Sequence, residues 1–197
     1  MKKPGLLDLR PTQFVLGMRE IEFKIAKIEK FSKAELQDYC DDHQIPVVIG
    51  PKGEPFLIDH HHFARACYET QVDTYSIKVI KNLQSKNEKD FWNFMVREGW
   101  VYLNDQFGVG PHSPQALPSD IRCLADDPFR SLTWEMLNAG VIKKQDIPFF
   151  EFQWAAFFRF NLDRPLHSKS DFKEVIALAK KLSRSKDASH LPGYLNK

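Results

Sequence analysis

The 197-residue chain has little cysteine and almost no charge excess. Its only cysteines, Cys40, Cys67 and Cys123, are widely spaced. An odd set without a CxxC pair excludes a closed disulfide framework and a four-cysteine zinc site, so we expect buried, reduced thiols, with a reactive thiol as the alternative. Lys and Arg number 28 against 26 Asp and Glu, which leaves a net charge of +2. Proteins that coat nucleic acid usually carry a larger basic excess.

Long apolar runs are also missing. No stretch approaches the ~18 uninterrupted apolar residues of a transmembrane span, and Asp8, Arg10 and Gln13 interrupt the N-terminal segment where a signal sequence would need such a run. We therefore expect a cytoplasmic protein with no membrane partner. The GxxxxGK[ST], kinase, GxSxG and HExxH patterns are absent, as is a helix-turn-helix with a basic second helix. The sequence therefore lacks the motifs of P-loop proteins, protein kinases, serine hydrolases and zinc proteases, and of helix-turn-helix DNA-binding proteins.

Hydrophobic periodicity predicts helices and strands in the first hundred residues and helices after them. The expected early elements are a strand-like segment at 21–31, a helix from Ser32 with Glu35 in a capping box, a hairpin around 50–53, a helix at 59–70 with Asp59 at its N-cap, a strand at 74–83 and a helix capped by Asn87. Later helices are expected at 127–140, 147–160 and 170–185.

These patterns predict an α+β protein of ordinary domain size. Residues 1–104 are expected to form a compact α+β unit. Residues 105–197 are expected to form a helical extension that packs onto it as part of the same folded unit. The aromatic residues between 149 and 160 are expected to fill the core, because helical spacing favours packing over a base-stacking platform.

The most distinctive motif is Asp59-His60-His61-His62, at a predicted strand-to-helix junction. Unpaired backbone N–H groups and the helix dipole favour an anion there, and imidazoles add hydrogen bonds to phosphate oxygens. We predict a phosphate or nucleotide site, with Asp59 able to orient the histidines or to share Mg²⁺. Zinc binding and a capped helix with solvated histidines are the alternatives. Consecutive histidines point in different directions around a helix, which disfavours zinc.

A second group of polar residues lies earlier in the chain, between Arg10 and Lys24. Alone, such charges usually form a solvated surface. If this segment folds over the histidine helix, Glu20 would be the general base, and Lys24 or Arg19 would pair with phosphate charge.

Residues 57–66, LIDHHHFARA, resemble the signature of the ParB/sulfiredoxin superfamily, in which a strand leads into an Asp-Gly-His-His-Arg turn and helix. Further segments resemble the ParB-like nuclease group: Leu9–Gln13 with Gly17, Asp127–Leu132, Pro148–Ala155 and Leu191–Tyr194. The resemblance spans nearly the whole chain. It implies a ParB/sulfiredoxin-like N-terminal unit with a small mixed sheet and helices.

The resemblance also implies nucleotide handling at the helix start. The superfamily includes CTP binding and hydrolysis in chromosome-partitioning ParB, ATP-dependent sulfinic acid reduction in sulfiredoxin, and serine phosphorylation in a kinase branch. By similarity His61 and His62 match the paired histidines and Asp59 matches the acid. Glu20 matches the glutamate base of the kinases, with Glu22 as the competing position.

This sequence departs from the signature at two positions. His60 stands where the signature has glycine, and Phe63 stands where it has arginine. We therefore expect Arg65 or Lys24 to supply the missing charge. The sulfiredoxin cysteine is absent from this turn, which argues against sulfinic acid repair.

Together these features predict a ParB-like protein that binds a nucleotide (ATP, ADP or CTP, with Mg²⁺) or a phosphodiester. We expect phosphoryl transfer or phosphate-ester hydrolysis, by a phosphotransferase or kinase, or by a hydrolase of the nuclease type. The alternative is a non-catalytic nucleotide- or DNA-binding module. The near-neutral charge favours a small nucleotide or phosphorylated substrate over DNA. The expected catalytic residues are Glu20, Asp59, His61 and His62, and the expected phosphate-binding residues are Gln13, Lys24, His60 and Arg65.

Overall fold

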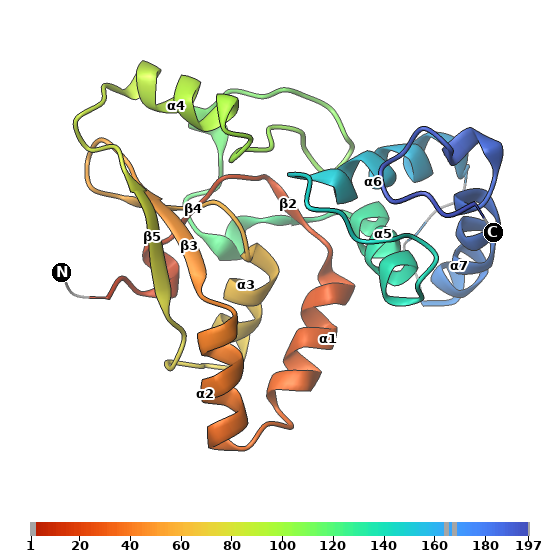
Figure 1. The fold of residues 1–197 in the computed structure, drawn as a ribbon, viewed down its shortest axis with the longest axis horizontal. Helices are drawn as coiled ribbons and strands as arrows, with labels where there is room; N and C mark the ends of the chain where they lie inside the picture. Colours follow the sequence, from red (N-terminus) through yellow and green to blue (C-terminus); the bar gives the residue numbers. More distant parts are fainter. Residues whose placement is uncertain (1–2, 164–165, 167–168, 197) are drawn as a thin grey trace. The chain divides into compact units, whose positions relative to one another are not determined.

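The computed structural model describes residues 3–163, 166 and 169–196. The chain forms two compact units, Met1–Ala125 and Asp126–Lys197 (Figure 1). Residues 105–125, which follow the boundary expected from the sequence, belong to the first unit. They include two short 3₁₀ helices, η2 (Pro114–Ala116) and η3 (Ile121–Cys123).

A four-stranded mixed sheet forms the centre of the first unit. Its strands lie in the order β1 (Arg10–Pro11), β4 (Pro55–Leu57), β3 (Ile45–Ile49) and β5 (Ile77–Asn82). The β3–β4 pair is antiparallel, which confirms the predicted hairpin, and the other two pairs are parallel. Gly53 has a φ of 84° in the hairpin turn, where glycine adopts a conformation that other residues rarely take. β5 lies at one edge of the sheet.

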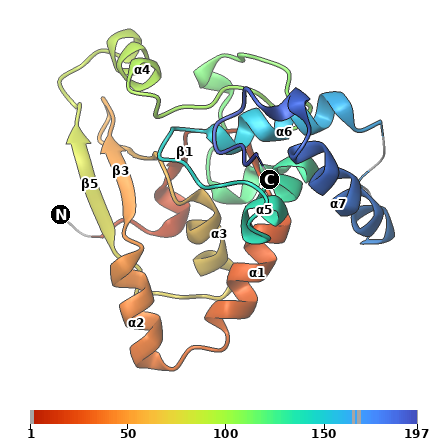
Figure 2. The ribbon, with the colours of Figure 1, turned by 45° about the vertical axis from the view of Figure 1, so that its right-hand side comes forward.

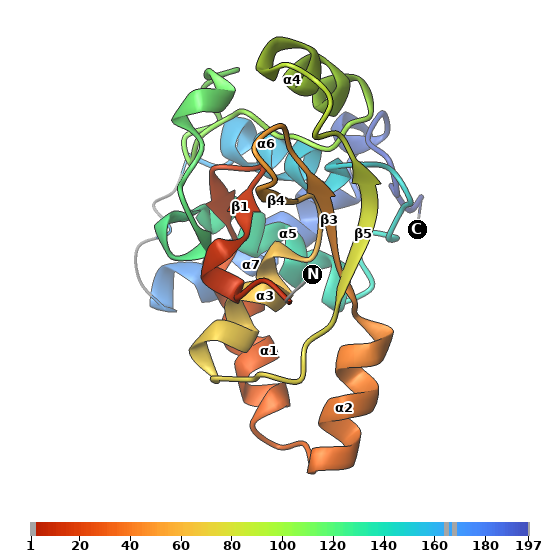
Figure 3. The same ribbon diagram turned by 90° about the vertical axis from the view of Figure 1, so that its left-hand side faces the viewer.

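The two faces of this sheet pack against different helices, because successive strand residues point in opposite directions. Val47, Ile49 and Leu57 belong to a core that includes side chains of α1 (Met18–Ile28) and α3 (His61–Glu69). Val48 and Phe56 instead pack with Phe91 and Met95 of α4 (Glu88–Arg97). Figure 3 shows α4 at the top of the view and α1 and α2 at the bottom.

The prediction of a strand-like segment at 21–31 is wrong, because these residues belong mainly to helix α1. Ile21, Ile25 and Ile28 follow helical spacing, and all three pack in the core. Phe23, which the alternating pattern would have buried with Ile21 and Ile25, is 49% exposed. The sequence contains both a two-residue and a helical repeat of apolar residues, and the residues of the helical repeat are the ones that pack in the core.

The other early elements agree with the predictions. α2 (Lys33–Asp42) begins with the predicted capping box: Ser32 Oγ accepts from Glu35 N–H at 3.3 Å and the Glu35 carboxylate accepts from Ser32 N–H at 2.8 Å. Asn87 caps α4 through its Oδ1, which accepts from Asp90 N–H at 2.9 Å. β5 occupies most of the predicted strand at 74–83.

A second, two-stranded sheet pairs β2 (Val15–Leu16) with β6 (Ala125–Asp126). Ala125 N–H donates to the carbonyl of Phe14 at 2.9 Å. η1 (Leu6–Asp8) precedes β1.

The cysteines differ in their exposure. Cys40 and Cys67 are buried, and burial raises the pKa of the Cys67 thiol. Cys123 is exposed, so the expectation of buried thiols is wrong for this residue. It lies at the end of η3, a short surface helix with only Ile121 buried.

The second unit contains the three predicted helices, α5 (Pro128–Asn138), α6 (Phe150–Asn161) and α7 (Lys169–Ser183), followed by η4 (Lys186–Ala188) (Figure 2). Phe150, Trp154 and Phe158 lie in its core, as predicted for the aromatic segment. Phe160 departs from that prediction with 90% exposure. Across the residues that the structure describes, no helix is both long and apolar enough to cross a membrane.

Candidate functional site

α3 begins at His61, and its N-cap is His60, not Asp59 as predicted. His60 is the N-cap and has a left-handed backbone conformation, with a φ of 61°. Glycine adopts this conformation at little cost, which explains why a glycine suits this position in the signature that the chain resembles. Asp59 is exposed, and its Oδ1 accepts from His60 N–H at 2.6 Å. The N-cap side chain makes no hydrogen bond to the first turn of the helix.

His61 is buried and joins the start of α3 to the segment after β1. Its Nε2 accepts from Thr12 N–H at 3.3 Å, and the ring also bonds to the carbonyl of Leu57. Burial is the largest cause that lowers the pKa of His61, to about 3, and the neighbouring His62 and His60 act in the same direction against Asp59. His61 is therefore neutral near pH 7, and its Nε2 acts as a hydrogen-bond acceptor.

His62 joins the start of α3 to the start of α1. Its Nε2 accepts from the backbone N–H of Gly17, the N-cap of α1, at 2.9 Å. Glu20 Oε2 lies 3.6 Å from the same nitrogen. The starts of α1 and α3 therefore lie side by side, next to the Glu20 carboxylate.

Glu20 lies in the first turn of α1. Its Oε1 is 3.4 Å from Nζ of Lys24, one turn later, and the two side chains are 13% and 22% exposed. The positive ends of two helix dipoles favour a carboxylate at this position. Glu22 is exposed and lies two residues from Glu20 on a helix, so it points elsewhere. Of the two glutamates considered from the sequence, Glu20 is the one beside His62.

α2 adds residues to this region that sequence analysis missed. The His43 ring lies 6.1 Å from that of His60, and His43 Nδ1 is 2.8 Å from the carbonyl of Tyr39. Lys27 Nζ lies 4.5 Å from the centre of the Tyr39 ring. Burial is the main cause that lowers the pKa of His43, and the charges of His60, Lys24 and Lys27 add to it while the Tyr39 carbonyl opposes it.

Part of this group had a signal in the sequence. Glu20, Lys24 and Lys27 are spaced i, i+4 and i+7, so they share one face of α1 once the segment is recognised as a helix. No local pattern connects His43 with His60, because the β3–β4 hairpin separates them in the sequence. In the described part of the chain, the buried Nδ1 of His60 has no hydrogen-bond partner.

Gln13 and Arg65 make contacts within the protein instead of joining the Glu20 group. Gln13 is buried, and its Nε2 donates to the Val15 carbonyl at 2.6 Å. Arg65 Nε donates to Glu69 Oε1 at 2.6 Å, and its Nη1 donates to the Ile121 carbonyl at 3.1 Å. Their predicted contacts with phosphate stay predictions.

Within residues 3–163, 166 and 169–196, no group of three or more His, Cys, Asp or Glu side chains is arranged to hold a metal ion. Mg²⁺ commonly binds one or two carboxylates together with phosphate oxygens and water. The exposed Asp59 carboxylate fits that mode only when a phosphate ligand completes the coordination.

A mixed sheet whose strand β4 leads into a helix that begins with consecutive histidines places the first unit among the ParB-like α+β domains. Residues 4–160 match the model of the family described as "Putative ParB-like nuclease", and the chain belongs to that family. It is also similar to the crystal structure of protein Atu1540 from Agrobacterium tumefaciens. That similarity has a TM-score of 0.88 and 35% sequence identity, and covers 100% of this chain and 98% of the other. No curated protein matches the sequence.

Proposed function

We propose that the first unit binds the phosphate of a nucleotide, or a phosphodiester, at the start of α3 and catalyses phosphoryl transfer or phosphate-ester hydrolysis. The observation that carries this proposal is the position of Glu20. Its carboxylate lies 3.6 Å from His62 Nε2, at the start of α3, and 3.4 Å from Lys24 Nζ. A carboxylate beside a cation and a helix N-terminus suits a general base next to a phosphate site.

Three features would hold the phosphate. The first turn of α3 has no hydrogen bond from its N-cap side chain, so its backbone N–H groups can meet an anion. His60 Nδ1 is buried and, among the described residues, has no partner. Lys24 supplies a positive charge one helical turn from Glu20. These groups fit phosphate oxygens, which accept hydrogen bonds but donate none when ionised.

In the proposed reaction Glu20 accepts a proton from the attacking hydroxyl or water as the new P–O bond forms. Lys24 and His60 stabilise the negative charge on the phosphoryl oxygens, and the leaving group departs with the electrons of the broken P–O bond. Mg²⁺, held by Asp59 and the phosphate oxygens, would neutralise part of that charge. His61 and His62 act as positioning residues in this scheme, because they accept hydrogen bonds from Thr12 and Gly17.

The test compares Glu20→Gln with Glu22→Gln, an exposed position on the same helix. The wild-type protein is incubated with labelled ATP, ADP, CTP and a nicked plasmid, each with and without Mg²⁺, and products are measured. Glu20→Gln is expected to lower turnover by roughly 10²- to 10⁴-fold, the usual contribution of a general base. Glu22→Gln should leave turnover unchanged. Thermal shift should show that both variants still bind the ligand.

The same experiment distinguishes the non-catalytic alternative. If the protein binds a nucleotide but forms no product, and Glu20→Gln does not change the binding, the enzyme hypothesis is wrong and the protein is a nucleotide-binding module.

A further inference from the structure

Three cations surround one partly buried aromatic ring of α4. Nζ of Lys81 lies 4.8 Å from the centre of the Phe94 ring, Nζ of Lys86 lies 5.7 Å from it, and the guanidinium carbon of Arg97 lies 4.9 Å from it. Each contact is favourable by itself as a cation–π interaction. Together they bring three like charges around a single side chain, an arrangement that a neighbouring anion would stabilise.

The local charge of this region is different from that of the rest of the chain. Residues 77–99 contain five basic and three acidic residues, an excess that equals the +2 of the whole sequence. Over the residues with described positions, no carboxylate lies within ion-pair distance of Lys81 or Lys86, while Arg97 is 3.4 Å from Glu98. The near-neutral total charge therefore conceals a local excess of positive charge. It comes from Lys78 and Lys81 of β5 and from Lys86, since the two basic residues of α4 are balanced by Glu88 and Asp90.

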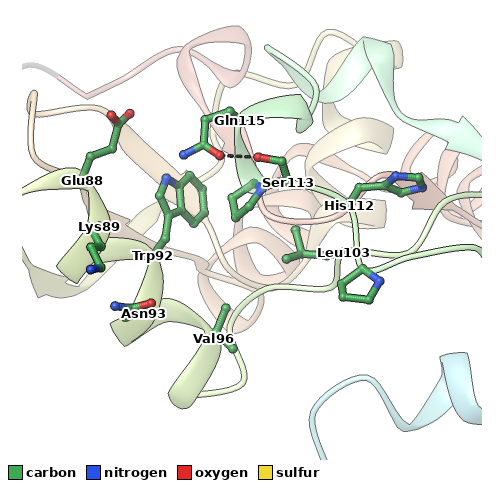
Figure 4. Close-up of a pocket in the computed structure, with 11 residues that line it drawn as sticks. Glu88, Lys89, Trp92, Asn93, Val96, Leu103, His112, Ser113 and Gln115 are labelled. Atoms are coloured by element: carbon green, nitrogen blue, oxygen red, sulfur yellow. Dashed lines mark hydrogen bonds between the residues drawn. The ribbon is translucent and has the colours of Figure 1, made fainter.

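A groove of about 680 Å³ lies on the other side of α4. Figure 4 shows Trp92, Asn93 and Val96 of α4 along one wall, with Leu103 on the opposite side. Gln115, whose Oε1 accepts from Ser113 Oγ, lies above the Trp92 ring in this view. Trp92 offers a flat surface for stacking, and the two side-chain amides carry both donors and acceptors.

Helix geometry connects the groove with the cations. Successive residues are separated by about 100° around a helix, so Trp92 and Phe94 lie about 200° apart. Phe91 and Met95 occupy the buried side of α4. Asn93 and Arg97 lie on the exposed arc between Trp92 and Phe94. A flexible chain can therefore cross the exposed side of α4 from the groove to the cations.

We propose that this surface, defined by Lys81, Lys86, Trp92, Asn93 and Arg97, binds single-stranded nucleic acid. A base enters the groove and stacks on Trp92, and the phosphates that follow contact Lys81, Lys86 and Arg97. Stacking platforms beside basic surfaces are the usual way to bind single strands without sequence preference. A duplex keeps its bases stacked inside the helix, so it gains only the phosphate contacts. The proposal does not depend on catalysis at Glu20.

Fluorescence anisotropy with a labelled oligothymidylate of about 12 nucleotides tests the phosphate contacts. Lys81→Glu, Lys86→Glu and Arg97→Glu are combined, and the matched control combines Lys33→Glu, Lys144→Glu and Lys173→Glu, which are exposed lysines elsewhere with the same charge change. The α4 variant should bind at least about tenfold more weakly at low salt. The slope of log K against log salt should fall by about 2, which is three phosphate contacts at ~0.7 each. Equal weakening in both variants overturns the proposal.

An abasic oligonucleotide of the same length tests the stacking contact. Trp92→Leu keeps an apolar side chain next to Phe56 but removes the flat ring. It should weaken oligothymidylate binding about tenfold and leave binding of the abasic chain unchanged. An equal effect on both chains, or equal affinity of the wild-type protein for single strand and duplex, overturns the stacking contact. The α4 variants are scored by oligonucleotide binding and Glu20→Gln by turnover, so failure at α4 and failure of the proposed reaction give different results.

Discussion

In the first unit the buried histidines accept hydrogen bonds from the backbone, whereas in the second unit buried polar side chains pair with each other or with a carbonyl near the C-terminus. His61 and His62 accept hydrogen bonds from the backbone N–H groups of Thr12 and Gly17. Glu20 and Lys24, which lie nearby on α1, are partly exposed. In the second unit the Asp127 carboxylate is 2.6 Å from the Arg159 guanidinium. The first arrangement places ionisable groups beside a helix N-terminus, and the second uses an ion pair to join two helices.

This difference explains the conspicuous motifs of the second unit. Asp127 caps α5 by accepting from Phe129 N–H at 2.9 Å, and burial raises the pKa of its carboxyl while Arg159 opposes that rise. Trp154 Nε1 donates to the carbonyl of Pro192 at 2.8 Å, which joins the segment 148–155 to the segment 191–194. Asp127 and Trp154, which belong to segments that resemble the ParB-like group, therefore make structural contacts within this unit.

Substitution of Gly193 is expected to have the largest effect on the stability of the second unit. It has a φ of 78°, and a Cβ there would collide with the backbone carbonyl of Lys143. Gly193→Ala should lower the free energy of unfolding by about 3 kcal/mol or more, from the left-handed conformation and the backbone clash together. Gly140→Ala is the control, with a φ of 65° and no atom within 4 Å of the added Cβ, and should cost only about 1 kcal/mol. Urea unfolding measures both. Equal losses would show that the Lys143 contact has no effect.

Asp127→Ala tests whether the ion pair in this unit stabilises the fold beyond the helix cap. The substitution removes a cap and leaves Arg159 without its carboxylate, so we expect a loss of about 2–3 kcal/mol. Asn87→Ala removes the cap of α4 and an exposed hydrogen bond to the Asp90 carboxylate, with no buried ion pair, and should cost about 1 kcal/mol. Urea unfolding again gives the two values. If they coincide, the Asp127–Arg159 pair contributes nothing beyond capping.

The pH dependence of stability tests the role of His61 in the first unit. In the unfolded chain His61 takes up a proton near pH 6.5, whereas in the folded protein it does so only near pH 3. The unfolded state binds more protons between these values, so stability falls as the pH falls below 6.5. The expected loss is roughly 1.4 kcal/mol between pH 7.5 and 5.5.

His61→Gln should reduce this loss, because Gln does not titrate and its carbonyl can still accept from Thr12. His190→Gln, at an exposed position in the second unit, is the control and should keep the wild-type slope. An unchanged slope in His61→Gln would mean that other groups cause the pH dependence.

Most helices were predictable because their signals are local. The Ser32 and Asn87 caps and the hairpin turn at Gly53 each involve residues a few positions apart, and all were found where expected. The failure at α1 has a different cause. The spacing of Ile21, Ile25 and Ile28 fits a helix while Ile21, Phe23 and Ile25 fit a strand, and only the surrounding core decides which set is buried.

The site was predictable only in part. The histidines and Glu20 could be named from the motif and the resemblance, but the use of each ring nitrogen could not. Thr12 lies 49 positions and Gly17 lies 45 positions from the histidines that they bond to. His43 entered the site through the packing of α2, which no spacing in the sequence indicates. Lys27 could be placed with Glu20 and Lys24 only after their segment was recognised as helix α1.

The sequence by itself determined the class of fold, the family and the total charge of +2. It did so because composition, helix caps and short motifs depend on residues close together in the chain. The tertiary structure decided which histidine nitrogens are occupied, which glutamate lies beside His62, and that Lys81, Lys86 and Arg97 surround the Phe94 ring. Hydrogen bonds and electrostatic fields depend on distances in space, and the fold sets those distances between residues far apart in the sequence.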